Sequence, residues 1–441
     1  MGQAVAPNGP GPTPLTRSLI IAPQWIGDAV MTEPLMASLA ARGERLTVAA
    51  LPWVAPVYRA MPQVADVIEL PFAHGRLDWA QRRRIATGLR GRFDAAYVLP
   101  NSIKAALIPW LARIPRRVGY HGEGRVWLLN RRLPNPGGRP PMVAFYSALA
   151  GMAPAEATAR GVAGSPADGS EAPHSRADAH SHSHPHADGN PDAHAQPQPQ
   201  PQPPPRPHPH LRPHLSFNVA TLQAATHAAG VQPGAYWVFA PGAEYGPAKC
   251  WPAEHYAALA RSLHTRHGQP VLLLGSGKEA ALCEQIAQSA PGACRVLAGQ
   301  TALIDAMALI AAARGVVSND SGLMHVAAAF GVPQAAVFGS TSPEHTPPLN
   351  PRARVLWLKH ELALDCSPCF ERRCRFGHTR CLTEVEPQRV ERALNEAAMH
   401  GADDHADLDP PQPVERALNK AQAATATGSA PPPQRPTAFR A

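Results

Sequence analysis

Asp28 has the residue type and the local sequence expected of a general base. It follows Gly27 in the segment PQWIGDAV, directly after the apolar run TRSLIIA. A Gly–Asp pair on a strand-to-helix turn lets the backbone approach a ligand closely, and it projects the carboxylate from the carboxyl end of the strand. The alternative interpretation is that Asp28 only caps the following helix, which is a common role for Asp at such a turn.

The segment APGAEYGPAKCWP, residues 240–252, has the composition of a phosphate-binding loop. Its glycines and small residues expose backbone N–H groups that can hold an anion. Lys249 adds a point charge suited to a diphosphate, and Glu244 and Tyr245 of the same loop are predicted to contact the bound ligand. The alternative is an ordinary loop with a solvated lysine.

The segment SNDSGLMH, residues 318–325, predicts a second anion site at the start of a helix. Unpaired N–H groups at a helix N-terminus favour negative charge, and Ser321 and Gly322 stand at that position. Gly322 would permit a close approach, while Asp320 and His325 would face the same ligand. The alternative is that Asp320 or Ser321 is a plain cap and that His325 belongs to the core.

Two further groups of residues could do chemistry. Glu279 ends the segment LGSGKE and could accept hydrogen bonds from ribose hydroxyls, although the segment departs from GxGxxG. Four cysteines separated by two, four and six residues suggest a structural zinc site, with a cysteine-lined loop without metal as the open alternative: Cys366, Cys369, Cys374 and Cys381. Nine histidines between 174 and 214 could capture metal, but low-complexity sequence explains them better.

The elements that must position these loops are predicted to be parallel strands alternating with helices, which makes the fold class α/β. The strands are expected in TRSLIIAP, ERLTVAALP, ADVIELP and DAAYVLP, and then in YWVFAPG, PVLLLG, RGVVSND, PQAAVFG and RVLWL. The composition divides the chain into five segments: a flexible N-terminus at 1–14, a first domain at 15–150, a disordered Pro- and His-rich linker at 151–214, a second domain at 215–399, and a disordered tail at 400–441. Ligands usually bind at the carboxyl ends of such strands.

Composition and charge narrow the class of protein. The 441 residues contain 44% apolar residues but 51 Pro, and no apolar run is long enough to span a membrane. The first residues lack a secretory signal, the Met-Gly start has Ala6 where a myristoylation pattern needs another residue, and seven Cys favour reduced thiols, so a cytoplasmic location is expected. Residues 15–150 hold 18 Lys and Arg against 8 Asp and Glu, which predicts an anionic partner for the first domain.

Four segments of the chain are similar to those of glycosyltransferase family 9, the heptosyltransferases of bacterial lipopolysaccharide. They are QWIGDAVMTEPL, APGAEYGPAKCWP, VVSNDSGLMHVAAAFGVPQAAVFGSTSPEHT and CSPCFERRCRFGHTRCL. The resemblance implies a GT-B fold, with two Rossmann-like domains facing a central cleft. It also implies an inverting transfer, without a metal or another cofactor, from ADP-L-glycero-β-D-manno-heptose. The acceptor would be Kdo2-lipid A that already bears its first heptose, since the segments around Lys249 and Cys366 resemble the branch that adds the second heptose.

The resemblance assigns roles residue by residue. Asp28 matches the family's catalytic base and Lys249 its phosphate-binding lysine, while Asp320, Ser321, Gly322 and His325 match its donor-binding loop and Glu279 its ribose-binding acid. Basic residues of the first domain would contact the anionic acceptor at the cytoplasmic face of the inner membrane: Arg82, Arg83, Arg116 and Arg117. The chain departs from the family pattern at Cys250, at Arg375 and in the length of the 160–214 segment.

Other functions stay open at this point. A heptosyltransferase of the same family could use a different core acceptor, and a nucleotide-sugar epimerase could share the architecture. A non-catalytic metal-binding protein could be built on the His-rich and Cys-rich segments. Nucleic-acid binding is not expected, because no stacking-aromatic motif accompanies the basic charge.

Overall fold

The structure is a computed structural model that describes residues 15–72, 77–152 and 212–403. Residues 1–14, the His-rich segment within 153–211 and the tail from 404 lie outside the described residues, so the predictions made for them stay predictions. Residues 212–214, which the prediction placed in the linker, are described, and the last helix continues to Asp403.

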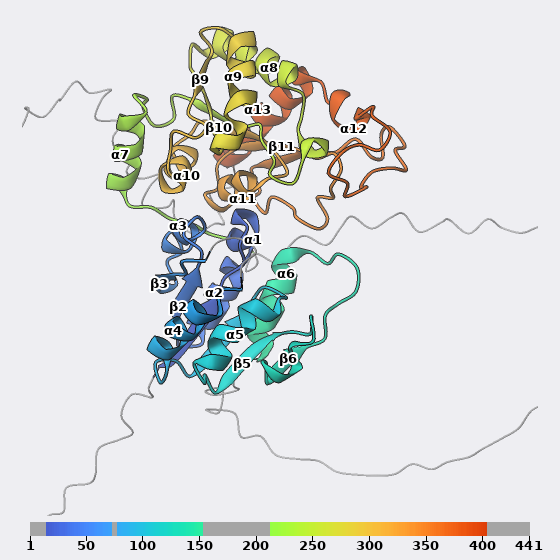
Figure 1. Ribbon diagram of the computed structural model, residues 1–441. Coiled ribbons are helices and arrows are strands. Elements are labelled where there is room, and N and C mark those ends of the chain that lie inside the picture. The colour runs from blue at the N-terminus through green and yellow to red at the C-terminus, as the bar shows by residue number, and fades with distance from the viewer. Residues whose placement is uncertain (1–14, 73–76, 153–211, 404–441) are drawn as a thin grey trace, which may run out of the picture. The chain divides into compact units, whose positions relative to one another are not determined.

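The first domain is built on a six-stranded parallel sheet with the order β3-β2-β1-β4-β5-β6 (Figure 1). Its strands are β1 (Thr16–Ile21), β2 (Glu44–Ala50), β3 (Val64–Glu69), β4 (Ala95–Val98), β5 (Arg116–Tyr120) and β6 (Arg131–Leu133). Its helices are α1 (Ile26–Met31), α2 (Glu33–Ala41), α3 (Ala55–Arg59), α4 (Trp79–Leu89), α5 (Ile103–Leu111) and α6 (Met142–Ser147). Short 3-10 turns, η1 (Arg125–Trp127) and η2 (Ala148–Met152), complete it.

Alternation along each strand produces two hydrophobic layers, one on each face of this sheet. Ile20 packs with α1, α2, α3 and α6, while its neighbours Leu19 and Ile21 pack with α4 and α5. Strands whose residues are apolar on both faces are typical of parallel sheets covered by helices on both sides. The continuous apolar runs in the sequence therefore correspond to the central strands.

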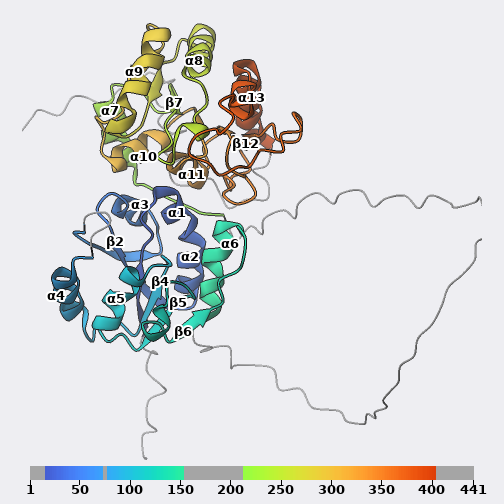
Figure 2. The ribbon, with the colours of Figure 1, turned by 45° about the vertical axis from the view of Figure 1, so that its right-hand side comes forward.

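The second domain repeats the arrangement, with the sheet order β12-β11-β10-β7-β8-β9 (Figure 2). Its strands are β7 (Trp237–Ala240), β8 (Val271–Leu273), β9 (Cys294–Val296), β10 (Gly315–Asn319), β11 (Gln334–Val337) and β12 (Ala353–Leu356). Its helices are α7 (Val219–Ala228), α8 (Ala253–His267), α9 (Ala280–Ser289), α10 (Leu303–Ala311), α11 (Gly322–Ala329), α12 (Arg380–Thr383) and α13 (Pro387–Asp403). Helices α8, α9 and α13 cover one face, and α7, α10 and α11 cover the other.

Both sheets have the strand order 3-2-1-4-5-6 when each is numbered from its own first strand. This is the Rossmann order, in which the chain direction across the sheet reverses between the first and fourth strands. The two reversal points lie between β1 and β4 and between β7 and β10, and ligands bind outside the carboxyl ends of strands at such points. The prediction of two Rossmann-like α/β sheets is confirmed.

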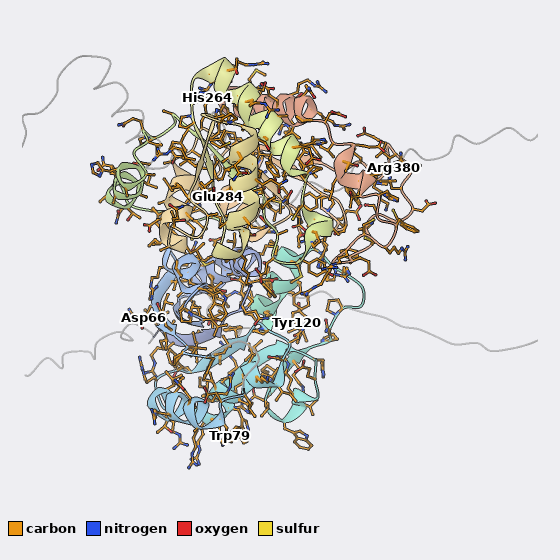
Figure 3. The ribbon with its side chains drawn as sticks, turned by 45° about the horizontal axis from the view of Figure 1, so that its top comes forward. Asp66, Trp79, Tyr120, His264, Glu284 and Arg380 are labelled. Atoms are coloured by element: carbon orange, nitrogen blue, oxygen red, sulfur yellow. The ribbon has the colours of Figure 1, made fainter. Side chains whose placement is uncertain are left out.

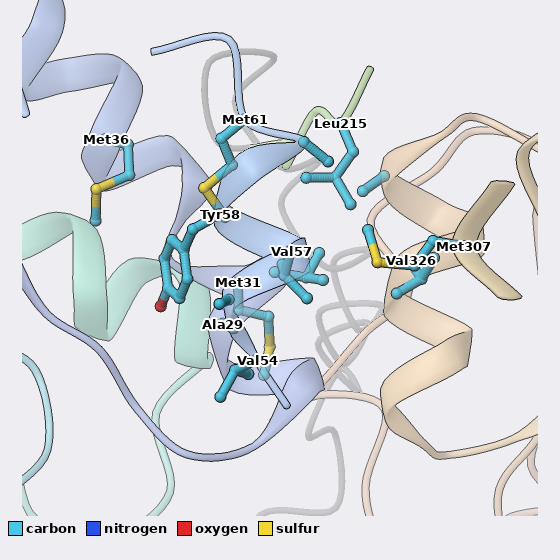
Figure 4. Close-up of a cluster of buried hydrophobic side chains, with 14 of the residues drawn as sticks. Ala29, Met31, Met36, Val54, Val57, Tyr58, Met61, Leu215, Met307 and Val326 are labelled. Atoms are coloured by element: carbon cyan, nitrogen blue, oxygen red, sulfur yellow. The ribbon is translucent and has the colours of Figure 1, made fainter. Parts of the chain in front are cut away.

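One hydrophobic cluster contains side chains from both domains (Figure 4). Met31, Val57 and Met61 of the first domain belong to the same cluster as Met307 and Val326 of the second. Leu215 joins the same cluster, and its backbone N–H donates to the carbonyl of Ala329 at 3.1 Å.

Glu33, the first residue of α2, is a buried acid that fastens the chain where it enters the second domain. Its carboxylate accepts from the His214 backbone N–H at 3.0 Å and from the Gln63 amide at 2.8 Å. Burial removes water from the carboxylate and raises its pKa to about 7, more than these two hydrogen bonds offset. A carboxyl group whose pKa is higher in the folded state than in the unfolded state stabilises the fold at low pH. This stabilisation is complete below about pH 4.5, and it is lost as the pH rises through 7.

We therefore expect Glu33→Gln to raise the free energy of unfolding by about 2–3 kcal/mol at pH 8 and to leave it nearly unchanged at pH 4.5. Gln63 Oε1 is buried without a partner, so the new amide has an acceptor available. Denaturant unfolding at the two pH values measures the effect. Glu361→Gln, at an exposed acid paired with Arg389 at 2.5 Å, is the control and should not reproduce this pH dependence. An equal effect of Glu33→Gln at both pH values would contradict the assignment.

Candidate functional site

Asp28 lies in α1, just beyond the carboxyl end of β1. Its carboxylate is half-buried and accepts a 3.0 Å hydrogen bond from the Tyr146 hydroxyl of α6. Burial raises the pKa of Asp28, and the Tyr146 hydrogen bond and the nearby charges of His345 and Lys249 only partly oppose this. A raised pKa makes a carboxylate a stronger base, as general base catalysis near neutral pH requires.

Lys249 and Asp320 form a buried ion pair at the reversal point of the second sheet. The Lys249 ammonium lies 2.6 Å from Asp320 Oδ2 and donates to the Asp320 backbone carbonyl at 3.1 Å. The two side chains are only 14% and 6% exposed. Lys249 lowers the pKa of Asp28 and Asp320 raises it, so the three charges are close enough to interact. The structure thus brings together the three predicted charged residues that follow β1, β7 and β10.

Asn319, the last residue of β10, connects that strand to the loop that carries Lys249. Its buried amide donates to the Pro241 carbonyl at 2.6 Å, and its oxygen accepts from the Trp251 backbone N–H at 2.9 Å and from the Tyr256 hydroxyl at 3.1 Å. Both ends of the 241–251 loop are therefore hydrogen-bonded to one side chain, which positions Lys249 between them.

Asn319→Ala is expected to lower the free energy of unfolding by about 3–5 kcal/mol, because three buried polar groups lose their partner at once. Urea denaturation measures this loss. Asn130→Ala is a matched control, since the exposed Asn130 also bonds two backbone groups, those of Arg117 and Pro115. Its cost should stay below about 1 kcal/mol. Similar losses in the two variants would show that the Asn319 network is not special.

The glycines of the two helix starts pack α1 against α11. A Cβ on Gly322 would lie 2.9 Å from the Ile26 Cβ, and one on Gly27 would lie 2.9 Å from the His325 ring. Gly322 therefore permits a close approach of α1, in addition to any close approach of a ligand. His325 is 5% exposed, and burial lowers its pKa to about 4, so it is neutral at pH 7.

Three hydroxyls at the carboxyl ends of β10 and β11 have no partner among the described residues. Ser321 Oγ, Ser340 Oγ and Thr341 Oγ1 are buried and accept or donate no hydrogen bond there. Buried polar groups are nearly always satisfied in folded proteins. Their concentration at this edge of the sheet, next to Lys249 and Asp320, indicates a site for a polar ligand.

The other predicted donor residues surround the same loop at different depths. Glu279 closes a capping box with Ser276, accepting from its N–H at 2.6 Å, and its carboxylate lies over Gly242, where a Cβ would collide with it. Glu244 is exposed and pairs with Lys278 at 2.6 Å. The Tyr245 hydroxyl donates to the Phe370 carbonyl, and its ring lies 5.4 Å from the Lys249 ammonium.

The structure does not bring the four predicted acceptor arginines to Asp28. Arg82 is 7% exposed, stacks on Phe72 and donates to the carbonyls of Leu77 and Lys104. Arg116 and Arg117 begin β5, at the amino end of the sheet, so they lie at the edge opposite Asp28. Their guanidinium groups bond to Glu44 and Tyr97 and to the carbonyls of Leu128 and Ile114 respectively. Arg83 is exposed on α4.

The chain has two parallel Rossmann-like sheets, the architecture of GT-B glycosyltransferases, with an acid at one reversal point and an ion pair at the other. The signature of glycosyltransferase family 9 (heptosyltransferase) matches residues 82–380. Lipopolysaccharide heptosyltransferase 2 of Escherichia coli is 36% identical over 386 residues, which are 86% of this chain and 97% of that protein. The chain belongs to glycosyltransferase family 9, the heptosyltransferases.

A second relative and a solved structure agree with this assignment. Lipooligosaccharide heptosyltransferase 2 of Haemophilus influenzae is 37% identical over 391 residues, which are 86% of this chain and 98% of the relative. The solved structure of Escherichia coli ADP-heptose lps heptosyltransferase II has a TM-score of 0.66 and 33% identity, and the match covers 88% of this chain and 99% of that one.

Sequence reasoning missed three residues that shape the site: Tyr146, His345 and Asn319. Tyr146 contacts Asp28 although the two residues are 118 positions apart in the sequence. His345 is held at α6, the helix of Tyr146, because the Met142 N–H donates to the His345 carbonyl at 3.0 Å. Neither has a local motif that reveals the contact. Asn319 stood inside the SNDSG segment, and its position between a buried strand and a helix start could have indicated it.

Proposed function

We propose that this protein transfers L-glycero-D-manno-heptose from ADP-heptose onto the first heptose of the lipopolysaccharide inner core. The observation that carries the proposal is the packing of Gly27, next to Asp28, against Gly322 and His325, in the segment that bears Asp320 of the Lys249–Asp320 ion pair. The names of the relatives, heptosyltransferase 2 of lipopolysaccharide and lipooligosaccharide and an ADP-heptose heptosyltransferase, support this donor and this acceptor class. The first domain, 15–150, would bind the acceptor and the second, 215–399, the donor.

Asp28 would act as the general base. The acceptor hydroxyl attacks the anomeric carbon from the face opposite the diphosphate, and its proton passes to the Asp28 carboxylate. The new glycosidic bond forms as the bond from the anomeric carbon to the phosphate oxygen breaks, so the configuration inverts. ADP leaves as an anion that needs no proton, and one carboxylate is sufficient, whereas glycoside hydrolysis uses two.

Lys249 and the start of α11 would stabilise the negative charge that grows on the departing ADP. Lys249 now neutralises Asp320, so a bound diphosphate would share or take over its ammonium. The unpartnered hydroxyl of Ser321 and the N–H groups of Ser321 and Gly322 would supply further donors, and each well-placed donor contributes about 3–4 kcal/mol to such a transition state. Asp320 would contact the heptose, and Glu279 would contact the ribose hydroxyls. Glu244 and Tyr245 would contact the outer side of the nucleotide. His325, which is buried in α11, would support the donor-binding loop.

Tyr146 would position Asp28 and adjust its basicity. Its hydrogen bond lowers the pKa of Asp28, so Tyr146→Phe should raise that pKa and move the acidic limb of the kcat/KM profile upward by about 1 pH unit. The rate well above that limb should recover. Tyr120→Phe removes a hydroxyl that bonds the Phe145 carbonyl instead and should leave the profile in place. If the kcat/KM profile of Tyr146→Phe did not shift, Tyr146 would not adjust the pKa of the general base.

We also propose that the first domain binds the cytoplasmic face of the inner membrane peripherally. None of the helices in the described part of the chain has the length and hydropathy of a membrane span. Five apolar side chains that follow the carboxyl ends of β3, β4 and β5 are 40–85% exposed: Leu77, Trp79, Ile103, Val126 and Trp127. Figure 3 shows Trp79 at the outer edge of the first domain. Tryptophan favours the membrane interface, and Arg83 on α4 would meet anionic headgroups.

Binding to anionic vesicles tests this surface. Trp127→Ser and Arg83→Ala should weaken it, and added salt should weaken it further. Trp110→Ser is the control, because Trp110 is 42% exposed at the opposite end of α5. If neither added salt nor these substitutions changed the affinity for anionic vesicles, the peripheral contact would be refuted.

The transfer itself is tested by incubation with ADP-heptose and lipopolysaccharide acceptors truncated after the first heptose, after Kdo, or further out, with mass analysis of the products. One added heptose on the first-heptose acceptor alone supports the proposal. Addition only to another acceptor would reassign the core position. Altered ADP-heptose in the absence of acceptor would favour an epimerase.

A further inference from the structure

Four thiols that take no part in the proposed transfer surround one small cavity. The cavity has a volume of about 20 Å³, room for a single water-sized particle, and its lining includes Cys366, Cys369, Cys374, Cys381 and His378. All four cysteines are free thiols. Among the described residues no three potential ligands already meet at metal-binding geometry, so the thiols would have to come closer together to reach a zinc–sulfur distance of about 2.3 Å.

The backbone turns tightly just after Cys374. The Gly377 N–H donates to the Cys374 carbonyl at 3.2 Å. That turn needs left-handed backbone at Gly377, with φ of +74°, and at Thr379, with φ of +44°, and Phe370 directly after Cys369 has φ of +54°. Non-glycine residues rarely adopt this conformation unless the surroundings hold them there. These residues hold the chain in one tight turn, which keeps Cys374 at the wall of the cavity with the other three thiols.

The segment that carries the first three cysteines has no regular secondary structure. Residues 357–379, all of them described, contain no helix or strand, and no side chain from 368 to 379 is fully buried. Long loops without secondary structure in compact domains are uncommon unless they serve a function or are cross-linked. A metal ion held by four thiolates supplies such a cross-link.

We propose that Cys366, Cys369, Cys374 and Cys381 bind one zinc ion, which fixes this segment against the donor loop. Two pairs of cysteines, two and six residues apart, give the four-sulfur set typical of structural zinc. Each thiol gives up its proton to the solvent as it binds, so the site carries the charge of four thiolates around one divalent ion.

The cysteine segment is in direct contact with the loops of the donor site. The Phe370 N–H donates to the Ser340 carbonyl at 2.7 Å, and the Ala248 N–H donates to the Arg372 carbonyl at 3.1 Å. The Phe370 carbonyl accepts the Tyr245 hydroxyl. Ala248 is the neighbour of Lys249, so zinc would hold the lysine in place without touching the ligand.

Elemental analysis of the full-length protein, purified with reductant and without chelator, tests the proposal. We expect one zinc per chain, lost in Cys369→Ser and in Cys374→Ser and retained in Cys283→Ser, whose thiol is buried in the core of the second domain. Because the histidines of 174–210 could also hold metal, cobalt replaces zinc in a second measurement. Thiolate-to-cobalt charge-transfer absorption, present in the unmodified protein and absent in the two site variants, identifies sulfur ligands.

The consequence for the donor loop is measured by ADP binding. Loss of zinc in Cys369→Ser should weaken ADP by about 10-fold, and Cys283→Ser should bind it normally. Zinc that persists in both site variants, or four thiols that react as free thiols in the unmodified protein, would overturn the metal site. Unchanged ADP affinity in the zinc-free variant would overturn the link to the donor loop. Metal content is independent of heptose transfer, so failure of the proposed function would leave this result intact.

Discussion

Replacing Asp28 with asparagine is expected to lower the turnover number for heptose transfer by about 10²- to 10⁴-fold, the range that a positioned general base contributes. The amide keeps the size of the side chain and can still meet the Tyr146 hydroxyl, so the fold and the site geometry should be preserved. It cannot take up the proton of the acceptor hydroxyl. The dissociation constant for ADP should change little, because the proposed mechanism places Asp28 against the acceptor hydroxyl and not against the diphosphate.

Steady-state kinetics with the first-heptose acceptor and calorimetric ADP binding measure the two quantities. Asp66→Asn, at an exposed acid of the same domain on β3, is the matched control and should be unaffected in both. A turnover number for Asp28→Asn within about threefold of the unmodified enzyme would exclude it as the base. A large loss of ADP binding would instead place it in the donor site.

Replacing Lys249 with methionine should weaken ADP by about 10- to 100-fold, as expected for the loss of a charge-assisted contact to a diphosphate. The turnover number should fall by a further 10²- to 10³-fold, because the charge on the leaving ADP is then less well stabilised. Lys249 also neutralises the buried Asp320 at 2.6 Å, so the single variant leaves an uncompensated carboxylate.

The double variant Lys249→Met with Asp320→Asn separates these effects. It removes the stranded charge and should regain stability but not turnover. Arg389→Met is the control, because Arg389 pairs with the exposed Glu361 and neither residue is assigned to the donor site. Full transfer by the double variant would mean that Lys249 serves only to neutralise Asp320.

Much of this arrangement could be predicted from sequence because the decisive signals are local. Buried parallel strands are continuous apolar runs, and the residues that follow them converge at one edge of the sheet. Asp28, Lys249 and Asp320 could therefore be proposed together from their positions after such runs. Strands β5, β6 and β9 were missed, since they are short and contain arginines at positions where a central strand would have apolar residues.

The arginines show where sequence reasoning stops. The composition correctly indicated that the first domain is basic. It could not indicate that the guanidinium groups of Arg82, Arg116 and Arg117 form hydrogen bonds inside that domain. The contact of Tyr146 with Asp28 likewise depends on how α6 packs on α1, which no spacing in the sequence records. Side-chain direction is a property of tertiary packing, and it decides which charges are available to a ligand.

The glycine contact between α1 and α11 limits how the active centre can deform. Gly27 precedes Asp28, and Gly322 follows Ser321, so the point where the two helices touch is one residue from each proposed reacting group. In any rotation about a fulcrum, the points nearest the axis travel least. Swinging one sheet against the other about this contact would open the periphery widely for a bulky acceptor while the separation of acid and anion site hardly changed.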